Sequence, residues 1–419
     1  MESTKVSQNS EELSRDHSSV RVAWVMPTLA RGFYWQPVFK IIAERFPGMK
    51  IFAGIWPGYL PGLEGSFKVE KFNAGKMMAK RWRKKRFIWT SPSLAWKLIR
   101  FRPSLIVTGG FHLGTMYLLA LKPLLRWRVV LLWDGIGAEI IQLDNPIRLK
   151  LRAFMAKWFE FALSTTVDGA NYLTDVVQMP RSRVGQYFYL VPDITALCAN
   201  DTGRDVFRKE WRRNGPVFLY VGTLCREKGT HKLIECCKAQ DDKGITDFTR
   251  LLIGEGYMEE EVDRLREELG ISQQLFRLGQ IRYEELGAYY RESDVFLFPS
   301  LDDPLAMVVL EAMAFGKPIL CSKYAGAKEL VLDGENGFVF DPLDTQQIVD
   351  QMEKIIRNRD MIARLGARSL EIIKPYTPEA SADTIIGVVN RALRDANPIP
   401  YDSPLPRIQD SPVAGDREQ

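Results

Sequence analysis

Short apolar segments alternate with helical patterns along most of the chain. From Val20 onward, the runs VRVAWVMP, KIFAGIW, SLIVTGG and RVVLLW are typical of buried strands, and PVFKIIAERFP between the first two has a helical pattern. A second series follows with PVFLYVG, TRLLIGEG, LFRLG, DVFLFPS, KPILCS and GFVFD. Alternation of strands and helices predicts parallel sheets covered by helices on both faces. We therefore expect an α/β protein with two doubly wound domains.

Polar segments set the expected domain boundaries. We expect residues 20–197 to form an N-terminal domain, residues 198–214 a linker and residues 215–375 a C-terminal domain. A helical pattern over residues 376–396 could pack back on the N-terminal domain. Residues 1–19 are polar and residues 397–419 are rich in proline, so we expect both ends to be disordered.

Composition narrows the class of protein. The chain has 419 residues, of which 46% are hydrophobic, and this suits two globular domains. The five cysteines form no CxxC pair and the three histidines lie far apart in the sequence. We therefore expect a protein of the reducing cytosol without a structural zinc site. We expect no signal peptide, because the first 20 residues lack an apolar core, and no transmembrane helix, because charged residues and proline interrupt the apolar runs.

Positive charge is concentrated in the first half. Residues 20–195 contain 26 Lys and Arg against 10 Asp and Glu, an excess of 16, whereas the whole chain carries only +5. The segment KMMAKRWRKKRFIW, residues 76–89, mixes these cations with aromatic residues. This mixture favours an anionic membrane surface as the binding partner of the segment. A solvated helix face is the alternative. No RNA-binding motif is present, so we expect no nucleic acid partner.

The loops that follow strands carry the candidate chemistry, because ligands of open α/β sheets bind beyond the carboxyl ends of the strands. YVGTLCREKG contains Gly222, Thr223, Arg226 and Lys228, and glycines beside two cations suit a diphosphate, although a solvated turn is the alternative. This segment lacks the Walker pattern, which disfavours a P-loop NTPase. LLIGEG, which contains Glu255, lacks the third glycine of the dinucleotide fingerprint.

The segment SLDDPLAMVVLEAMAFGKPI combines a helical pattern with two carboxylates. Asp303 followed by Pro304 predicts a helix N-cap and first helical position, and the helix start suits phosphate oxygens. Glu311 lies eight residues on, which is about 12 Å along such a helix. A buried carboxylate needs a specific partner. Two carboxylates at that separation could hold different parts of one extended ligand, such as a nucleotide sugar.

Four blocks in order, VGTLCREKG, LLIGEG with RLGQI, SDVFLFPSLDDPLAMVVLEAMAFGKPIL and YAGAKELVLDGENGFVF, resemble the retaining glycosyltransferases of family 4. Within that family, the chain resembles the group 1 type glycosyl transferases of bacterial polysaccharide or glycolipid synthesis. The resemblance covers nearly the whole C-terminal half. It implies the GT-B fold, in which two Rossmann-like domains face a central cleft.

The resemblance also implies roles for individual residues. Glu311 is expected to hold the ribose hydroxyls of the donor, Asp303 to lie beside the transferred sugar, and Lys228 to clamp the diphosphate. The remaining expected donor contacts are Gly222, Thr223, Glu255, Gly279, Ile281, Arg282, Leu305, Ala306 and Met307. Family members usually have Glu at the position of Asp303, Phe-Gly at Leu305-Ala306 and Arg at Thr223, and we expect Arg226 to replace the missing arginine.

The N-terminal half resembles the family only loosely. Candidate acceptor contacts are Gly32 in PTLARGFYWQP, His112 in GGFHLG and Asp134 in LLWDGIG. The family commonly has a histidine near the transferred sugar at the position of His112, which makes this residue a catalytic candidate together with Asp303, Glu311, Lys228 and Arg226. The alternative for His112 is a structural role.

We therefore expect a retaining hexosyltransferase that needs no metal and no cofactor. It would move a hexose from a nucleotide diphosphate sugar to a hydroxyl of a glycan or lipid-linked acceptor, as a cytoplasmic protein peripheral to the inner face of the plasma membrane. No spaced DxD pair lies in a suitable loop, since Asp302 and Asp303 are adjacent. The alternatives are a GT-B sugar-nucleotide epimerase and a degenerate transferase that serves as a binding scaffold.

Overall fold

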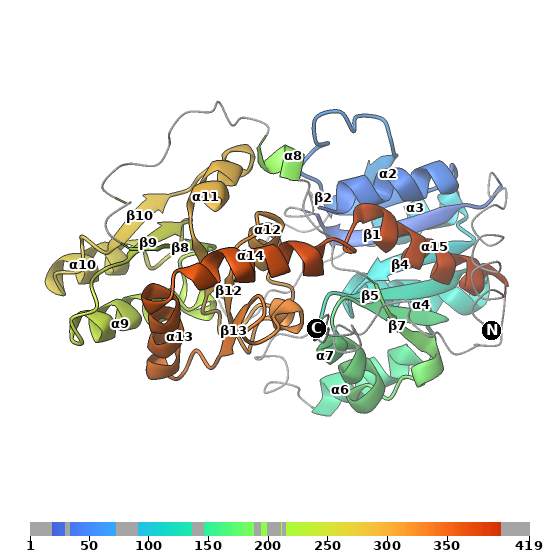
Figure 1. The fold of residues 1–419 in the computed structure, drawn as a ribbon. Helices are drawn as coiled ribbons and strands as arrows, with labels where there is room; N and C mark the ends of the chain where they lie inside the picture. The colour runs from blue at the N-terminus through green and yellow to red at the C-terminus, as the bar shows by residue number, and fades with distance from the viewer. Residues whose placement is uncertain are drawn as a thin grey trace, which may run out of the picture. The chain divides into compact units, whose positions relative to one another are not determined.

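The computed structural model describes residues 19–29, 34–72, 91–135, 146–187, 194–198, 211 and 215–394 (Figure 1). Among these residues, those before Val191 and those from Tyr376 onward form the first domain, and those between Pro192 and Pro375 form the second. Gly32, residues 76–89, most of the expected linker and both expected disordered ends lie outside the described residues.

The first domain is built on a seven-stranded parallel sheet of order β3-β2-β1-β4-β5-β6-β7. In register, Val25 of β1 lies between Phe52 of β2 and Thr108 of β4. The strands are β1 (Val22–Thr28), β2 (Lys50–Ile55), β3 (Val69–Lys71), β4 (Leu105–Gly109), β5 (Arg128–Trp133), β6 (Phe161–Ser164) and β7 (Val184–Gln186).

Helices cover both faces of this sheet because successive strand residues point to opposite sides. Ala23 and Val25 belong to a core shared with α3, α4 and α6, whereas the ring of Trp24 lies 5.6 Å from that of Trp35 and 5.2 Å from that of Phe39 in α2. The last helix, α15, packs on α2 and β5. The helices are α2 (Trp35–Arg45), α3 (Ser93–Phe101), α4 (Leu113–Leu125), α6 (Pro146–Ala156), α7 (Val167–Asn171) and α15 (Pro378–Arg394).

The second domain contains a six-stranded parallel sheet of order β10-β9-β8-β11-β12-β13. Its strands are β8 (Val217–Val221), β9 (Thr249–Ile253), β10 (Leu275–Gly279), β11 (Val295–Phe298), β12 (Ile319–Ser322) and β13 (Gly337–Phe340). Its helices are α8 (Ile194–Leu197), α9 (Thr230–Asp241), α10 (Glu259–Glu268), α11 (Leu286–Glu292), α12 (Met307–Ala314), α13 (Thr345–Arg357) and α14 (Asp360–Ile373).

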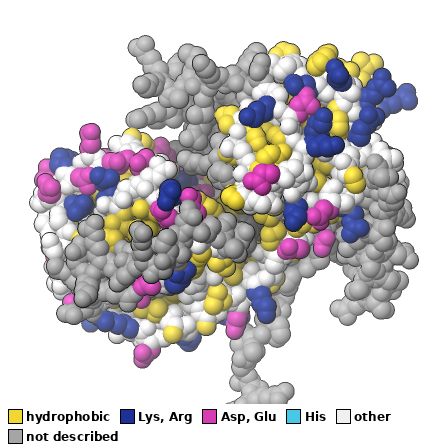
Figure 2. Space-filling view, turned by 90° about the horizontal axis from the view of Figure 1, so that it is seen from above, with side chains coloured by type: hydrophobic (Ala, Val, Ile, Leu, Met, Phe, Trp, Pro, Cys, Tyr) yellow, Lys and Arg dark blue, Asp and Glu magenta, His cyan; other side chains and the backbone are white. Residues whose placement is uncertain are grey.

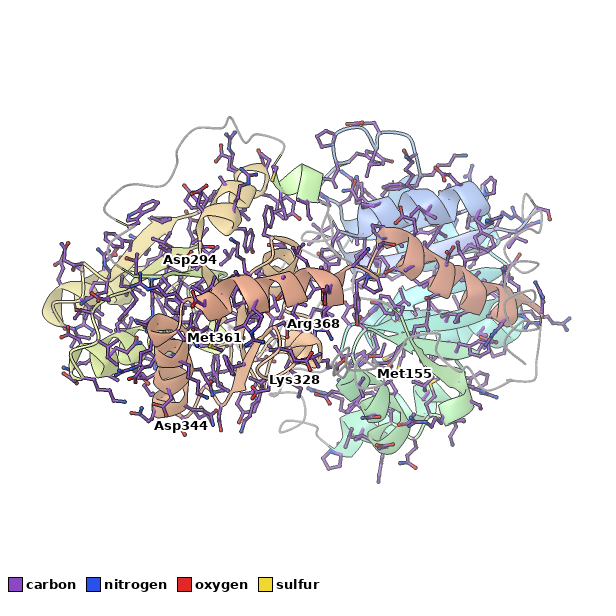
Figure 3. The ribbon with its side chains drawn as sticks, viewed as in Figure 1. Met155, Asp294, Lys328, Asp344, Met361 and Arg368 are labelled. Carbon is purple, nitrogen blue, oxygen red and sulfur yellow. The ribbon has the colours of Figure 1, made fainter. Side chains whose placement is uncertain are left out.

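Asp344 lies at the start of α13 (Figure 3), where its carboxylate accepts a hydrogen bond from the backbone N–H of Gln347 at 3.1 Å.

Every strand predicted from the sequence is present, which confirms two parallel α/β sheets. Strands β3, β6 and β7 were not predicted; they have only three or four residues each and lie toward the two ends of the first sheet. The helix predicted to begin at Asp303 and Pro304 begins instead at Met307, so that prediction was wrong. Among the described residues, no helix is both long and apolar enough to cross a membrane.

Candidate functional site

The candidate donor residues lie at one edge of the second sheet. Because all six strands are parallel, the loops after them emerge at the same edge. The positions predicted from the sequence follow four of these strands: Gly222, Thr223, Arg226 and Lys228 follow β8, Glu255 follows β9, Gly279, Ile281 and Arg282 end or follow β10, and Asp303, Leu305, Ala306 and Met307 follow β11. The fold therefore brings residues 80 positions apart in sequence to one edge.

Backbone hydrogen bonds connect these loops to one another. The N–H of Leu224 donates to the carbonyl of Glu255 at 3.0 Å, and the N–H of Met258 donates to the carbonyl of Leu224 at 3.2 Å. On the other side, the carbonyl of Glu227 accepts from the N–H of Leu301 at 2.8 Å. The loop after β8 is thus bonded to the loops after both neighbouring strands.

Two glycines allow this close approach. Gly229 has a φ of +73°, and a Cβ built on it would lie 1.9 Å from the carbonyl oxygen of Pro299. Gly254 has a φ of +136°, and its Cβ would lie 2.0 Å from the carbonyl oxygen of Gly222. Only glycine fits without displacing backbone at such distances. These two glycines bring loop against loop rather than leaving space for a ligand.

Asp303 and Lys228 form an ion pair at the centre of this edge. The Lys228 Nζ lies 2.7 Å from Asp303 Oδ2 and donates to the carbonyl of Asp302 at 2.8 Å. Asp303 Oδ1 accepts from the N–H of Ala306 at 2.8 Å and from that of Leu305 at 3.3 Å. Ala306 has a left-handed backbone with a φ of +54°, and α12 starts directly after it.

This ion pair explains why the predicted helix start was wrong. An Asp-Pro pair suits an N-cap locally, but Lys228 holds the carboxylate, and the carboxylate in turn holds the N–H groups of Leu305 and Ala306. The segment therefore forms a turn, and the N–H of Ala306 already has an acceptor. One ammonium group and two adjacent N–H groups are donors that also suit a phosphate. We call these three groups the anion cradle.

Glu311 is buried one turn into α12. Its side chain is only 6% exposed, and its Oε2 accepts a hydrogen bond of 2.6 Å from the hydroxyl of Tyr290. The Tyr290 ring stacks on Phe315 with centroids 5.5 Å apart. Burial raises the pKa of Glu311 from 4.5 to about 7. Because α12 begins at Met307, Glu311 lies only about 6 Å along the helix from its start, closer to the edge of the sheet than the sequence predicted.

Arg226 forms an ion pair with a residue that is not part of the anion cradle. Its side chain is 60% exposed and its guanidinium forms an ion pair with Glu261 of α10 at 3.2 Å. Its backbone N–H donates to the hydroxyl of Tyr257 at 2.9 Å, and that hydroxyl donates to Glu227 Oε2 at 2.9 Å. The replacement of the missing arginine by Arg226 stays a prediction.

Three residues that connect these loops and helices were not predicted from the sequence. Tyr290 supplies the side-chain partner of Glu311, while Tyr257 and the backbone of Glu227 connect the loops. Tyr257 directly follows the Gly-Glu-Gly segment, which is a local signal. Tyr290 lies 21 residues before Glu311 and no spacing rule indicates it. Among the described side chains, no group of three or more His, Cys, Asp or Glu could hold a metal ion.

In the first domain, the candidate acceptor residues follow β4 and β5. His112 is the N-cap of α4, and its Nδ1 accepts from the N–H of Thr115 at 3.2 Å. Burial lowers the pKa of His112 to about 4, so the ring is neutral at pH 7. Asp134 Oδ1 accepts from the hydroxyl of Tyr187 at 3.1 Å. Helix capping alone can explain the hydrogen bond of His112. Contacts of His112, Asp134 and Gly32 with an acceptor stay predictions.

The second domain is similar in sequence to known glycosyltransferases. Residues 201–371 match the model of the family Glycosyl transferases group 1. The alpha-D-kanosaminyltransferase of Streptomyces kanamyceticus is 23% identical over 244 residues, which cover 56% of this chain and 63% of that protein. The lipopolysaccharide core biosynthesis glycosyltransferase LpsE of Rhizobium meliloti is 26% identical, over 41% of this chain and 49% of the relative. The chain thus spans less than two thirds of either relative.

Solved structures show the same fold over both domains. HepE of Anabaena, in complex with UDP, superposes with a TM-score of 0.71 at 16% identity and covers 89% of this chain and 100% of that one. WaaG, a glycosyltransferase involved in lipopolysaccharide biosynthesis, superposes with a TM-score of 0.60 at 15% identity, over 87% of this chain and 99% of WaaG. The predicted GT-B fold is confirmed.

Proposed function

Since the second domain carries a Glycosyl transferases group 1 domain within a GT-B fold, we propose that the protein is a retaining, metal-independent glycosyltransferase. Its donor is a nucleotide diphosphate sugar, from which it transfers a hexose. Its acceptor is a hydroxyl of a glycan or a lipid-linked glycan at the cytosolic face of the membrane.

The observation that carries this proposal is the anion cradle. Lys228 and the N–H groups of Leu305 and Ala306 already bind one anion, the carboxylate of Asp303. A diphosphate oxygen would take the place of that carboxylate, and the cradle would then stabilise the charge that develops on the leaving group. Asp303, once displaced, would turn its carboxylate toward hydroxyls of the sugar. The complexes of HepE with UDP and with UDP-glucose favour a uridine donor as the first to test.

Glu311 is the proposed partner of the nucleoside part of the donor. Tyr290 donates to Oε2, and we assign Oε1 to the ribose hydroxyls. Hydroxyl donors bind a carboxylate better than a carboxylic acid, so donor binding should favour the ionised form of Glu311. The pKa of the Glu311 carboxyl group is about 7 before binding, so part of it is protonated at neutral pH. That protonated fraction would release its proton when the donor binds.

Charge at the edge of the sheet supports a mechanism without metal. The Lys228 ammonium group and the helix start of α12 offer positive charge to the diphosphate. The leaving phosphate would deprotonate the acceptor hydroxyl on the same face of the sugar, which retains the anomeric configuration. EDTA should leave turnover unchanged. Loss of activity with EDTA and its return with Mg²⁺ or Mn²⁺ would contradict this part of the proposal.

A donor panel tests the proposed function. The purified full chain is incubated with UDP-, GDP-, ADP- and dTDP-sugars, and release of the nucleoside diphosphate is followed with and without glycan acceptors. We expect turnover of one donor class, lost in Lys228→Ala, and a product with the donor's anomeric configuration by NMR. A changed sugar on an intact nucleotide would instead identify an epimerase. Binding without turnover would identify a scaffold.

Membrane association is also part of the proposal. Residues 76–89 were predicted to bind an anionic membrane, and they lie outside the described residues. Binding to anionic liposomes that weakens with salt is expected from their charge. Equal binding to neutral liposomes, or binding to neither, would contradict an electrostatic attachment.

A further inference from the structure

Helix α6 of the first domain presents an apolar stripe to solvent. Ile147, Leu151, Phe154 and the following Trp158 are 76%, 39%, 58% and 38% exposed. The first three, spaced by four and three residues, lie on one side of the helix, and Trp158 follows two residues after its end. The rings of Phe154 and Trp158 lie 6.5 Å apart, so the stripe is continuous at this end.

Cations flank the stripe. Arg148, Lys150 and Lys157 are exposed, and neither α6 nor Lys157 and Trp158 after it includes an acidic residue. With 100° of rotation per residue, Lys150 falls on one side of the stripe and Arg148 on the other, and Lys157 directly follows the end of the helix. A helix with an exposed apolar face that includes Phe and Trp between rows of cations is typical of the interface of an anionic bilayer.

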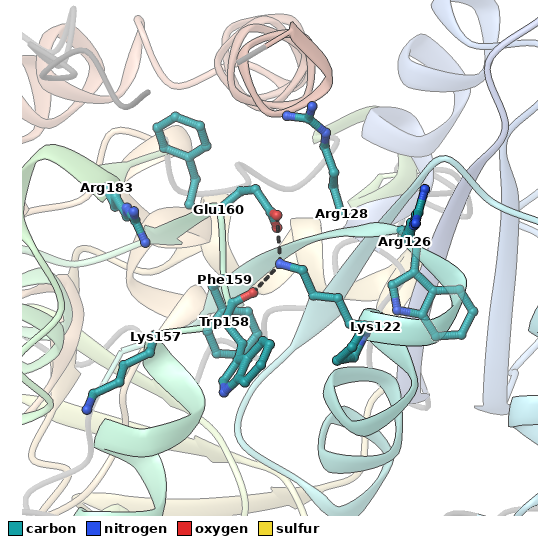
Figure 4. A pocket seen from close by; sticks show the side chains of 11 residues that line it. Lys122, Arg126, Arg128, Lys157, Trp158, Phe159, Glu160 and Arg183 are labelled. Carbon is teal, nitrogen blue, oxygen red and sulfur yellow. Dashed lines mark hydrogen bonds and ion pairs between the residues drawn. The ribbon is translucent and has the colours of Figure 1, made fainter. Parts of the chain in front are cut away.

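A basic pocket adjoins the end of this stripe (Figure 4). It has a volume of about 420 Å³, shares Lys157 and Trp158 with the stripe, and is lined by Lys122, Arg126, Arg128 and Arg183 against a single acid, Glu160. Lys122 pairs with Glu160 at 2.6 Å, which leaves an excess of cations around the pocket. Phosphate groups of lipid headgroups match this charge.

Charge is also uneven on a face of the molecule other than the one that carries α6. On the face seen in Figure 2, dark blue Lys and Arg side chains gather on the side of the first domain, whereas magenta Asp and Glu side chains are more frequent on the second. The excess of cations in residues 20–195 therefore reaches the surface.

The inner face of α6 contacts the candidate acceptor loops. The guanidinium of Arg152 lies 5.7 Å from the ring centroids of Phe111, Trp133 and Tyr172 and donates to the Tyr172 hydroxyl. Phe111 directly precedes His112, and Trp133 directly precedes Asp134. One helix therefore has an apolar outer face and an inner face that supports both loops.

We infer that the outer face of α6 docks on an anionic phospholipid bilayer, with Leu151, Phe154 and Trp158 at the level of the headgroups and the basic pocket against lipid phosphates. Docking itself is independent of sugar transfer. The consequence that a lipid-linked acceptor would arrive beside the loops of His112 and Asp134 rests on the proposed function.

Vesicle flotation of the full chain tests the docking surface. Vesicles contain phosphatidylcholine alone or with phosphatidylglycerol, at low and high salt, and no donor is added. We expect binding to the anionic vesicles, and a drop in affinity of about tenfold or more in the double variant Leu151→Ser, Phe154→Ser, because its apolar side chains no longer enter the interface. Lys150→Gln with Lys157→Gln should weaken binding to anionic vesicles and reduce its salt dependence.

The matched control is Leu370→Ser. Leu370 lies on α14 of the second domain and is 47% exposed, close to the value for Leu151. It should bind vesicles as the wild type does. The inference is overturned if the wild type does not bind anionic vesicles, if the α6 variants bind like the wild type, or if Leu370→Ser loses as much affinity as they do. Circular dichroism and thermal unfolding verify that each variant is folded. Donor turnover is measured separately, so a failed docking test leaves the proposed sugar transfer standing.

Discussion

The two domains present the same kind of edge, the carboxyl ends of a parallel sheet, but they hold their candidate residues differently. In the second domain, Asp303 and Lys228 meet each other across two loops, and Glu311 meets Tyr290 across two helices. In the first, Asp134 also has a long-range partner, Tyr187, but His112 is bonded within its own helix start. Long-range partners indicate a site assembled by the fold, whereas a local partner is explained by the helix alone. Four changes test this difference, beginning with the largest expected effect.

Lys228→Ala should remove most of the proposed transfer. The variant loses the ammonium group that would stabilise the leaving diphosphate, so we expect kcat/KM to fall about 10²- to 10³-fold. Lys238→Ala is the control, because Lys238 pairs with Asp242 on the surface of α9, away from the cradle. Initial rates of nucleoside diphosphate release measure both. Equal rates in the two variants would place the ammonium group outside the reaction.

Glu311→Gln should change the pH dependence of stability. Burial raises the pKa of Glu311 from 4.5 to about 7, so the folded wild type binds this proton more tightly than the unfolded chain. The resulting stability is fully present below pH 4.5 and is lost as the pH rises to about 7. Relative to the wild type, Gln should gain roughly 3 kcal/mol in the free energy of unfolding between pH 4.5 and pH 8. Urea titrations across this range measure it, and a constant difference would contradict the raised pKa.

The same substitution also tests donor binding. A neutral amide binds ribose hydroxyls less well than a carboxylate, and we expect donor affinity to fall about tenfold. Calorimetry in buffers of different ionisation enthalpy should show proton release on donor binding in the wild type and none in Glu311→Gln. Unchanged donor affinity would make Glu311 a structural carboxylate.

Gly229→Ala should destabilise the loops of the second domain. The new Cβ would meet the carbonyl oxygen of Pro299 in a left-handed backbone, and we expect the free energy of unfolding to fall by about 2 kcal/mol. Gly244→Ala is the control, since its φ of +70° is similar but nothing lies within 4 Å of its Cβ. Chemical unfolding of both separates the clash from the backbone strain. Equal losses would mean that close packing against Pro299 contributes nothing.

His112→Asn should have the smallest effect on stability. Asn is a good N-cap and can accept from the N–H of Thr115, so the free energy of unfolding should stay within about 0.5 kcal/mol of the wild type, whereas His112→Ala should lose about 1 kcal/mol. Thermal unfolding checks this. If the acceptor KM rises strongly in a stable His112→Asn variant, the ring contacts the acceptor and the contrast between the domains is weaker than the hydrogen bonds indicate.

The fold could be predicted because strand and helix periodicity are local properties. The strands with a clear apolar run, such as RVVLLW and DVFLFPS, were found, but FALS of β6 is too short to show a pattern and is a strand only because β5 and β7 pair with it. For the site, the order of the motif blocks indicated the right loops. The pairing of Asp303 with Lys228 could not be found from spacing, and it reversed a sound local prediction of the helix start.

The position of α15 has a consequence for the order in which the protein is made. This helix packs on α2 and β5 of the first domain, where Ile385, Val389 and Ala392 are buried and Arg128 donates to the carbonyl of Ala392 at 2.6 Å. A ribosome releases residues of the second domain before it releases α15. The domain that begins first is therefore completed last, and a chain that stops before Tyr376 can finish its second domain but leaves the apolar face of α2 without its cover.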